Sequence, residues 1–399
     1  MHEAVIVSAV RTPIGRANKG ALKDVRADDL AAFAVTAALE RVPQLDRALI
    51  EDVIVGCAFP EGEQGMNLAR LVGALAGLPE TAGGVTVNRF CASSLQAVNM
   101  AAQSIMLGDG DVIVAGGVES MSRVPMMGFS PSLNPRLMKH KEGEEYLSPY
   151  PPAQQEYALS SYIPMGITAE NLARDYHISR QAQDAFALHS HQKAVAATDN
   201  GIFQREIVPV TLPDGNVMRI DEGPRRDTTL EKLASLEPAF SKHNGTVTAG
   251  NSSPLNDGAA AAVLMSAEKA RELGIQPLAK VRSMAVAGVR PDRMGIGPVP
   301  AMKKALQRAG LQLSDIDIIE LNEAFAAQSL SVVQVMGIDV EKLNPHGGAL
   351  ALGHPLGCSG ARIIATLLND LQTENKTLGI ATLCIGGGQG LATVIERLS

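Results

Sequence analysis

Short runs rich in valine and isoleucine alternate along the chain with longer alanine-rich stretches. This alternation is typical of strands that alternate with helices in an α/β protein. The predicted buried strands are VIVSAV (5–10), EDVIVGCA (51–58) and DVIVAGG (111–117) in the first third, and AKVRSMAVAG (279–288), DIDIIELN (315–322) and LGIATLCIGGG (378–388) in the last.

The order of the elements repeats. In the first half an alanine-rich helix (93–108) begins just after Cys91 and leads into the strand at 111–117. In the second half a helix (359–371) begins just after Cys358 and leads into the strand that holds Cys384. We interpret this order as an internal duplication; the alternative is that α/β chains in general look alike at this level of detail.

Residues 121–249 differ in texture from both halves. They are rich in Met, Pro and Gly, and include an amphipathic pattern after Ser179 and a turn-like LPDGN (212–216). A long segment of this kind inside a compact fold is usually functional. We therefore expect a first half over 1–120 that continues at 250–272, a ligand-binding loop domain over 121–249, and a second half over 273–399.

Composition narrows the class of protein. The chain has 399 residues, which favours more than one domain, and a net charge of −7, which argues against a nucleic-acid partner. No apolar run approaches the ~18 residues of a membrane span. The chain opens on a strand-like segment without a leader pattern, and its four cysteines lack metal-like or CxxC spacing. We expect reduced thiols, no metal site and a cytoplasmic location.

Cys91 is the first candidate catalytic residue. It lies in VNRFCASSLQAV, between a strand-like VTV and the helix at 93–108. A helix N-terminus favours a thiolate and lowers a cysteine pKa from its usual ~8.5. By itself, the motif is explained as well by a small residue chosen for close packing.

His354 is the second, in GGALALGHPLG (347–357). Pro355 restricts the histidine to extended geometry, and the surrounding glycines predict an irregular loop with space around the imidazole. Such a ring can accept the thiol proton or donate a hydrogen bond to an oxyanion. A turn histidine without a chemical role is the alternative.

Cys384 and Asn322 complete the set. Cys384 ends a predicted strand just before Gly386, Gly387 and Gly388, whose peptide N–H groups can form an oxyanion hole. A core cysteine is the competing interpretation. Asn322, at a strand-to-helix junction, can hold a water or polarise a carbonyl, but a helix N-cap explains it equally well.

These motifs together resemble the thiolase family, over essentially the whole chain. The resemblance rests on Cys91 with its flanking residues, NEAF (322–325), GGALALGHP (347–355) and CIGGGQG (384–390), with VSAVRTPIGRANKGAL, AGGVESMS and GNSSPLNDGAAA as further matches. It implies a five-layered αβαβα fold of two duplicated halves with an inserted coenzyme A-binding loop domain. It also implies a homodimer or a homotetramer built as a dimer of dimers.

The resemblance further implies the roles of the residues. Cys91 would be the acylated nucleophile, His354 its activator and Cys384 the general acid/base. Asn322 would hold a water that forms one oxyanion hole with His354, and the N–H groups of Cys91 and Gly386 would form the other. Coenzyme A, a co-substrate and not a tightly bound cofactor, would contact Arg225, Ser253, Phe240, Ala249, Leu255, Met165 and Phe325, with Arg226 as an alternative to Arg225 at the phosphates.

The resemblance points to degradative 3-ketoacyl-CoA thiolases of fatty-acid β-oxidation, with a β-oxidation partner subunit as an open question. PMG (164–166) and CSGAR (358–362) differ from the HMG and ASGAR of acetoacetyl-CoA-specific members. The alternatives are a biosynthetic acetyl-CoA acetyltransferase, a β-ketoacyl-carrier-protein synthase, which needs a second histidine in place of Cys384, and a non-catalytic acyl-CoA-binding relative. We expect His346, in NPHGG, to be a solvated loop residue.

Overall fold

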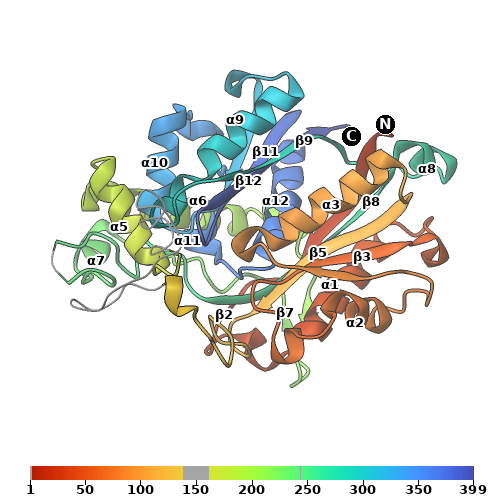
Figure 1. Cartoon of the computed structure of the whole chain (residues 1–399), viewed down its shortest axis with the longest axis horizontal. Helices are drawn as coiled ribbons and strands as arrows, with labels where there is room; N and C mark the ends of the chain where they lie inside the picture. Colours follow the sequence, from red (N-terminus) through yellow and green to blue (C-terminus); the bar gives the residue numbers. More distant parts are fainter. Residues whose placement is uncertain (1, 138–160, 243) are drawn as a thin grey trace.

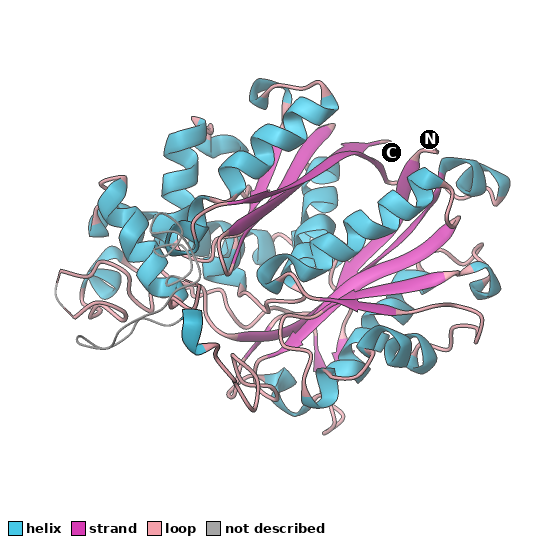
Figure 2. Cartoon of the chain, viewed as in Figure 1, coloured by secondary structure: helices cyan, strands magenta, loops and turns pink. Residues whose placement is uncertain are grey.

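The computed structural model describes residues 2–137, 161–242 and 244–399. In this part of the chain a mixed sheet runs through the molecule, helices cover its faces, and two further strands form a separate hairpin (Figure 2). No helix among the described residues is long and apolar enough to cross a bilayer.

The strands agree with the predicted runs. All six predicted strands are present, within a few residues of their expected ends. The sheet contains β1 (Ala4–Arg11), β2 (Gly15–Arg16), β3 (Asp52–Gly56), β4 (Val85–Val87), β5 (Val112–Ser120), β8 (Asn256–Ser266), β9 (Ala279–Gly288), β10 (Ile318–Leu321), β11 (Leu378–Ile385) and β12 (Gln389–Arg397), and the hairpin contains β6 (Val210–Thr211) and β7 (Val217–Met218).

The helices pack against the faces of this sheet. They are α1 (Ala27–Glu40), α2 (Leu68–Leu75), α3 (Ser93–Leu107), α5 (Met165–Asp175), α6 (Arg180–Asp199), α7 (Leu230–Ala234), α8 (Ala267–Glu272), α9 (Pro298–Ala309), α10 (Ala326–Met336), α11 (Ala349–Leu352) and α12 (Ser359–Thr373). The two predicted helices after Cys91 and Cys358 correspond to α3 and α12 and are confirmed.

The strand order shows the duplication directly. The sheet runs β10-β11-β12-β9-β1-β8-β5-β3-β4. In the first half β3 pairs with β5 in parallel, and β5–β8 and β8–β1 are antiparallel. In the second half β10–β11 is parallel, and β11–β12 and β12–β9 are antiparallel. The halves join where β1 pairs with β9, at Val5 with Lys280 and Ile6 with Ala279.

Five layers follow from this arrangement (Figure 1). Because side chains alternate along a strand, β1 directs Val5 and Val7 into a core shared with α1 and α2, and Ala4 and Ile6 into a second core. This second core holds α3 and α12 between the two halves of the sheet. A third core packs α9 and α10 on the outer face of the second half. The predicted αβαβα fold is therefore confirmed.

The region between β5 and β8 carries α5, α6, α7 and the hairpin. The predicted amphipathic helix is α6, whose N-cap Ser179 accepts a hydrogen bond from the Ala182 N–H at 3.1 Å. LPDGN turns between β6 and β7, closed by the Leu212 N–H and the Asn216 carbonyl at 2.8 Å. Residues 138–160 and 243 of the predicted loop domain lie outside the described residues. The predicted domain limits remain a prediction.

Candidate active site

Cys91 lies in a 3₁₀ turn, Phe90–Ala92, that leads directly into α3. Phe90 has a φ of +41°, and side chains fix the turn around it. Asn88 accepts from the Phe90 N–H at 2.8 Å, and Ser93 donates its hydroxyl to the Phe90 carbonyl at 2.6 Å. The predicted position at a helix N-terminus is confirmed.

The prediction that the Cys91 thiol has a lowered pKa is wrong. Complete burial raises the pKa of Cys91 to about 11, although the backbone N–H groups of Gly386 and Cys91 act in the opposite direction. The buried carboxylate of Glu119 adds a small further increase to this pKa. Desolvation therefore outweighs the helix terminus, and the free site holds a neutral thiol.

His354 lies in irregular chain between α11 and α12 and is only 4% exposed. Ser359 donates its hydroxyl to the Pro355 carbonyl at 2.8 Å, so its oxygen accepts from the imidazole Nδ1–H at 2.6 Å. The tautomer with an unprotonated Nε2 follows. Burial, with a smaller effect of Arg362, lowers the pKa of His354 to about 3, so the ring is neutral.

The glycines around His354 have a different role from the one we expected. A Cβ on Gly353 would lie 2.5 Å from the Asn256 side chain, and one on Gly357 would lie 2.5 Å from the Val118 carbonyl oxygen. They therefore permit close approach of neighbouring chain segments. Ser359 holds the imidazole, and Asn256 Oδ1 fixes the main chain by accepting from the His354 backbone N–H at 3.0 Å.

Asn322 follows β10, and its N–H donates to the Thr382 carbonyl of β11 at 3.0 Å. Its Nδ2 lies 3.2 Å from Nε2 of His354, the unprotonated ring nitrogen. The N-cap alternative is wrong, because the N-cap of α10 is Phe325. Asn322 Oδ1 is buried and has no partner among the described residues.

Cys384 lies near the end of β11 and is fully buried. Burial, together with the nearby Cys91, raises the pKa of its thiol well above the ordinary value. Gly386–Gly388 then turn the chain into β12, and the Gly386 N–H lies against the Cys91 sulfur. The structure thus brings Cys91, Cys384 and Gly386 together. Asn322 lies at the end of the adjacent strand β10 and contacts His354.

Apolar candidates for coenzyme A contact surround this centre. Met165 and Phe325 belong to the same apolar cluster as Cys384. Phe240 packs edge-on against Phe325, with ring centroids 5.9 Å apart, and lies over Gly166. Ser253 donates its N–H to the Ala324 carbonyl at 3.0 Å, which fixes it beside the NEAF segment.

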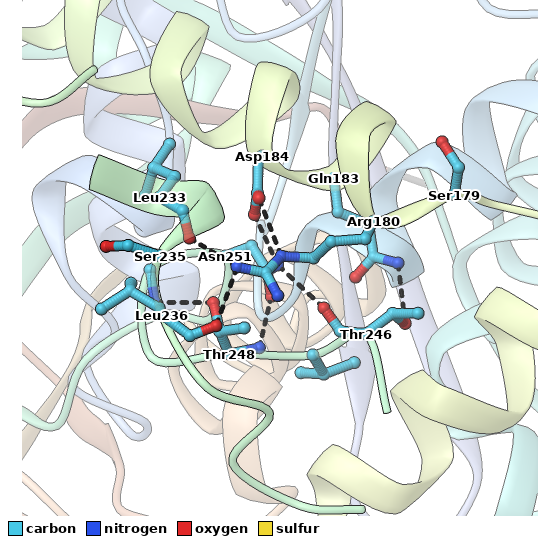
Figure 3. Close-up of polar contacts among 12 residues, drawn as sticks. Ser179, Arg180, Gln183, Asp184, Leu233, Ser235, Leu236, Thr246, Thr248 and Asn251 are labelled. Carbon is cyan, nitrogen blue, oxygen red and sulfur yellow. Dashed lines mark hydrogen bonds and ion pairs between the residues drawn. The ribbon is translucent and has the colours of Figure 1, made fainter. Parts of the chain in front are cut away.

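A polar network around Thr246, Thr248 and Asn251 (Figure 3) holds the chain just before Ser253. In α6, Asp184 binds Arg180 at 2.7 Å and accepts from Asn251 Nδ2 at 2.9 Å. Asn251 Oδ1 in turn accepts from the Thr248 N–H at 2.8 Å. Segment 246–251 is therefore fixed to α6 by buried, paired groups.

The other candidates lie outside the apolar cluster. Ala249, Leu255 and Arg225 are exposed. Arg226 is ion-paired with Asp199, whereas Arg225 has no ion pair among the described residues. Of the two guanidinium groups, that of Arg225 is thus the more available to a phosphate.

His346 differs from its prediction as a solvated loop residue. Its side chain is 12% exposed, and Nδ1 lies 2.7 Å from Asp370 Oδ1 of α12. Burial lowers the pKa of His346. The reason is that the NPHGG turn packs onto α12 and does not extend into solvent.

Two buried carboxylates near the site, Glu119 and Glu323, were not predicted from the sequence. Glu119 of β5 accepts from the N–H groups of Ala58 and Gly357 at 2.8 Å each, and so ties the histidine loop to β5. Glu323 accepts from the Ser190 hydroxyl at 2.6 Å and from the Leu350 N–H at 3.2 Å. An acid at the end of an otherwise apolar strand run, as in AGGVES, was the available signal.

Among the described residues no group of three or more His, Cys, Asp or Glu side chains is arranged to hold a metal ion.

Comparisons with known proteins agree with this arrangement. Residues 4–268 match the family model "Thiolase, N-terminal domain", and residues 275–397 match "Thiolase, C-terminal domain". A 3-ketoacyl-CoA thiolase of Shewanella denitrificans is 52% identical over the whole of both chains, and one of Bacillus subtilis is 50% identical over 99% of this chain and 100% of its own.

A solved structure is also similar. The acetyl-CoA acetyltransferase of Bacillus anthracis superposes with a TM-score of 0.88 at 44% identity, over 100% of this chain and 99% of its own. Both halves of the molecule and the full length of the relatives are matched. The chain therefore belongs to the thiolase family of acyltransferases.

Proposed function

We propose that this thiolase cleaves a 3-ketoacyl-CoA with coenzyme A, and releases acetyl-CoA and a shortened acyl-CoA through a thioester on Cys91. The observation that carries the proposal is that the Cys91 sulfur lies at the Gly386 N–H and close enough to Cys384 for the two thiols to interact electrostatically. One thiol can hold the acyl group while the other moves a proton.

In the first half of the reaction the Cys91 sulfur attacks the 3-keto carbon as its proton passes to Nε2 of His354. The C2–C3 bond breaks and leaves the enolate of acetyl-CoA. Asn322 Oδ1, which has no partner among the described residues, binds a water. This water and His354 stabilise the enolate oxygen, and the Cys384 thiol protonates the enolate carbon.

In the second half the Cys384 thiolate takes the proton of an incoming coenzyme A thiol. The resulting thiolate attacks the acyl carbon on Cys91, and the N–H groups of Cys91 and Gly386 stabilise the oxyanion. The bond to Cys91 breaks, its sulfur regains the proton from His354, and the site returns to its neutral form.

A neutral resting site suits this sequence of steps. The raised pKa of Cys91, about 11, and the lowered pKa of His354, about 3, keep the free pair as thiol and imidazole. Proton transfer then accompanies the attack on the substrate. In the second half the attacking coenzyme A sulfur and the departing Cys91 sulfur are both thiolates, so one thioester replaces another and the exchange is close to isoenergetic.

For coenzyme A we propose contacts with the apolar group Met165, Phe240 and Phe325, the fixed segment with Ala249, Ser253 and Leu255, and the guanidinium of Arg225. The supporting observation for Arg225 is its freedom from ion pairs among the described residues, in contrast to Arg226. Phosphates favour such an available guanidinium.

We propose the degradative direction, as part of fatty-acid β-oxidation, because the full-length relatives at 50–52% identity are 3-ketoacyl-CoA thiolases and the chain carries PMG and CSGAR. The second candidate, acetoacetyl-CoA synthesis, is favoured by the similarity to an acetyl-CoA acetyltransferase at 44% identity. A homodimer or a homotetramer in the cytoplasm, with or without a β-oxidation partner subunit, belongs to the same proposal and rests on the sequence.

The test is coenzyme A-dependent cleavage by the purified protein, with acetoacetyl-CoA compared to 3-ketooctanoyl-CoA. A higher kcat/KM for the longer substrate is expected. Cleavage of acetoacetyl-CoA alone would support the acetyltransferase alternative, and cleavage of neither would contradict the proposed reaction.

A further inference from the structure

A cavity of about 370 Å³ lies at the junction of the two halves, and none of the proposed catalytic or coenzyme A residues lines it. After Ile6, which accepts from the Leu278 N–H at 2.9 Å, β1 no longer pairs with β9. The separation exposes Val7, Ser8 and Ala9 of β1 to the cavity, opposite the C-terminal half of α12. Its volume is at the lower end of those that hold small-molecule ligands.

The inner wall of the cavity is apolar. Val7 and Ala9 come from β1, Ala365 and Leu368 from α12, and Leu278 from the segment before β9. Among them lies one polar atom without a partner. Ser8 is 1% exposed, and its Oγ has no hydrogen-bond partner among the described residues. Because that atom is buried from the cavity as well as from solvent, the surface that faces the cavity here is apolar.

The outer wall is cationic. Arg41 and Arg205 line it without an ion pair among the described residues, and Arg397 lines it with its guanidinium already bound to oxygens of Lys376, Asn375 and Ser399. Arg41 donates to the Arg205 carbonyl at 2.6 Å, which fixes these two residues side by side.

The nearby acid does not neutralise these cations. Glu206 is buried and already binds Arg11, with further hydrogen bonds from Thr366 at 3.0 Å and Asn369 at 3.0 Å. Burial lowers the pKa of Arg41, and Glu206 offsets that effect only in part. The guanidinium groups of Arg41 and Arg205 therefore lack an anionic side-chain partner among the described residues.

We propose that this cavity binds an amphipathic carboxylate, such as a medium-chain fatty acid. The carboxylate lies between Arg41 and Arg205, and the hydrocarbon chain lies against α12 and β1. The apolar wall distinguishes this ligand from inorganic phosphate, and the unpaired arginines distinguish it from a neutral lipid.

The experiment is calorimetric titration of the full-length protein with decanoate, with decanol and inorganic phosphate as comparison ligands. The test variant is Arg41→Gln/Arg205→Gln, whose side chains are exposed enough for the fold to tolerate the change. The matched control is Arg271→Gln/Lys303→Gln, which removes the same charge from two exposed positions elsewhere. Thermal unfolding checks that both variants fold.

We expect decanoate to bind the unchanged protein with a Kd on the order of 0.1–1 mM and the control variant equally well. Loss of the two arginines should weaken it about tenfold or more, since each charge-assisted hydrogen bond contributes substantially. Decanol and phosphate should each bind at least about tenfold more weakly than decanoate. Equal binding to the test variant, which would place decanoate in the acyl-binding part of the active site, would overturn the proposal. Equal binding of phosphate would do the same.

Discussion

The two halves of the molecule repeat the same strands but connect the last two of them very differently. In the first half, residues 121–255 separate β5 from β8 and carry α5, α6 and α7. In the second half, Gly386–Gly388 alone separate β11 from β12. One connection provides a broad platform beside the site, and the other provides a tight turn whose N–H group reaches Cys91. The two halves thus share their strand arrangement, and the parts that form the site are the connections in which the halves differ.

Cys91 and Cys358 occupy equivalent positions in the two halves, but their surroundings differ. Each precedes the inner helix of its half, and each is buried with a raised pKa, about 11 for Cys91 and about 12 for Cys358. Only Cys91 has the Gly386 N–H and a second thiol beside it, whereas Cys358 packs among Ala260 and Ala361. A helix N-terminus alone therefore does not make a nucleophile; the second half of the molecule must complete it.

The largest expected effect separates these two cysteines. Cys91→Ala should lower kcat/KM for 3-ketoacyl-CoA cleavage by at least about 10⁴-fold, because no other group can carry the acyl chain. Cys358→Ala, which leaves only a small void beside two alanines, should stay within about threefold of the unchanged enzyme. Steady-state thiolysis assays measure both. Comparable losses in the two variants would remove the distinction.

The next prediction concerns the reactivity of the Cys91 thiol with pH. Because its pKa is raised to about 11, the reactive thiolate should increase about tenfold for each pH unit. The rate of alkylation of Cys91 by iodoacetamide, followed by peptide mass spectrometry, should therefore rise about 100-fold from about pH 7 to pH 9. A plateau within that range would show a lowered pKa and return the dominant effect to the helix terminus.

A smaller effect tests the glycine turn. Gly387 and Gly388 both have positive φ, +78° and +83°, so alanine at either position should cost about 1 kcal/mol of folding free energy. Only at Gly388 would the added Cβ meet another atom, the Val289 carbonyl oxygen, at 2.4 Å. Gly388→Ala should displace the turn and lower kcat about tenfold more than Gly387→Ala. Kinetics and thermal unfolding of both variants check this, and equal kcat values would show that the turn's position is unimportant.

The smallest effect compares the two neighbouring arginines of the platform. Arg225→Gln should raise the KM for coenzyme A about fivefold with kcat unchanged, since it removes one phosphate contact. Arg226→Gln should raise it less than about twofold, because Arg226 is already paired with Asp199. The reverse order would assign the phosphate to Arg226.

Much of the fold could be predicted from local pattern. The runs that became β1, β5 and β9 are bounded by clear changes in composition, and Ser179 marks the start of α6 in the way an N-cap residue does. The order of the strands within the sheet could not be predicted from such patterns. Pairing of β1 with β9 depends on contacts between residues more than 270 positions apart, at Val5 and Lys280.

The same distinction between local pattern and long-range contact applies to the site. The positions of Cys91 and Cys384 at the ends of their elements could be read from flanking glycines and strand runs, but the pKa of Cys91 could not, because burial is a property of the assembled fold. The pairing of Asn322 with His354 and the contact of His346 with Asp370 join separate elements. Local sequence explained Asn322 equally well as an N-cap and predicted a solvated turn for His346. Contacts between separate elements decide against both interpretations.

The most direct test of the proposed reaction is to detect the acyl group on Cys91. The protein is mixed with 3-ketooctanoyl-CoA without free coenzyme A, quenched in acid, digested and analysed by mass spectrometry. The variant Cys384→Ala should form the thioester more slowly, because it lacks the acid that protonates the enolate, and should retain it longer when coenzyme A is added. We predict a hexanoyl group on the peptide that contains Cys91, and its removal when coenzyme A is added to the unchanged enzyme. An acyl group on Cys384 in place of Cys91, or cleavage of substrate with neither cysteine acylated, would contradict the account.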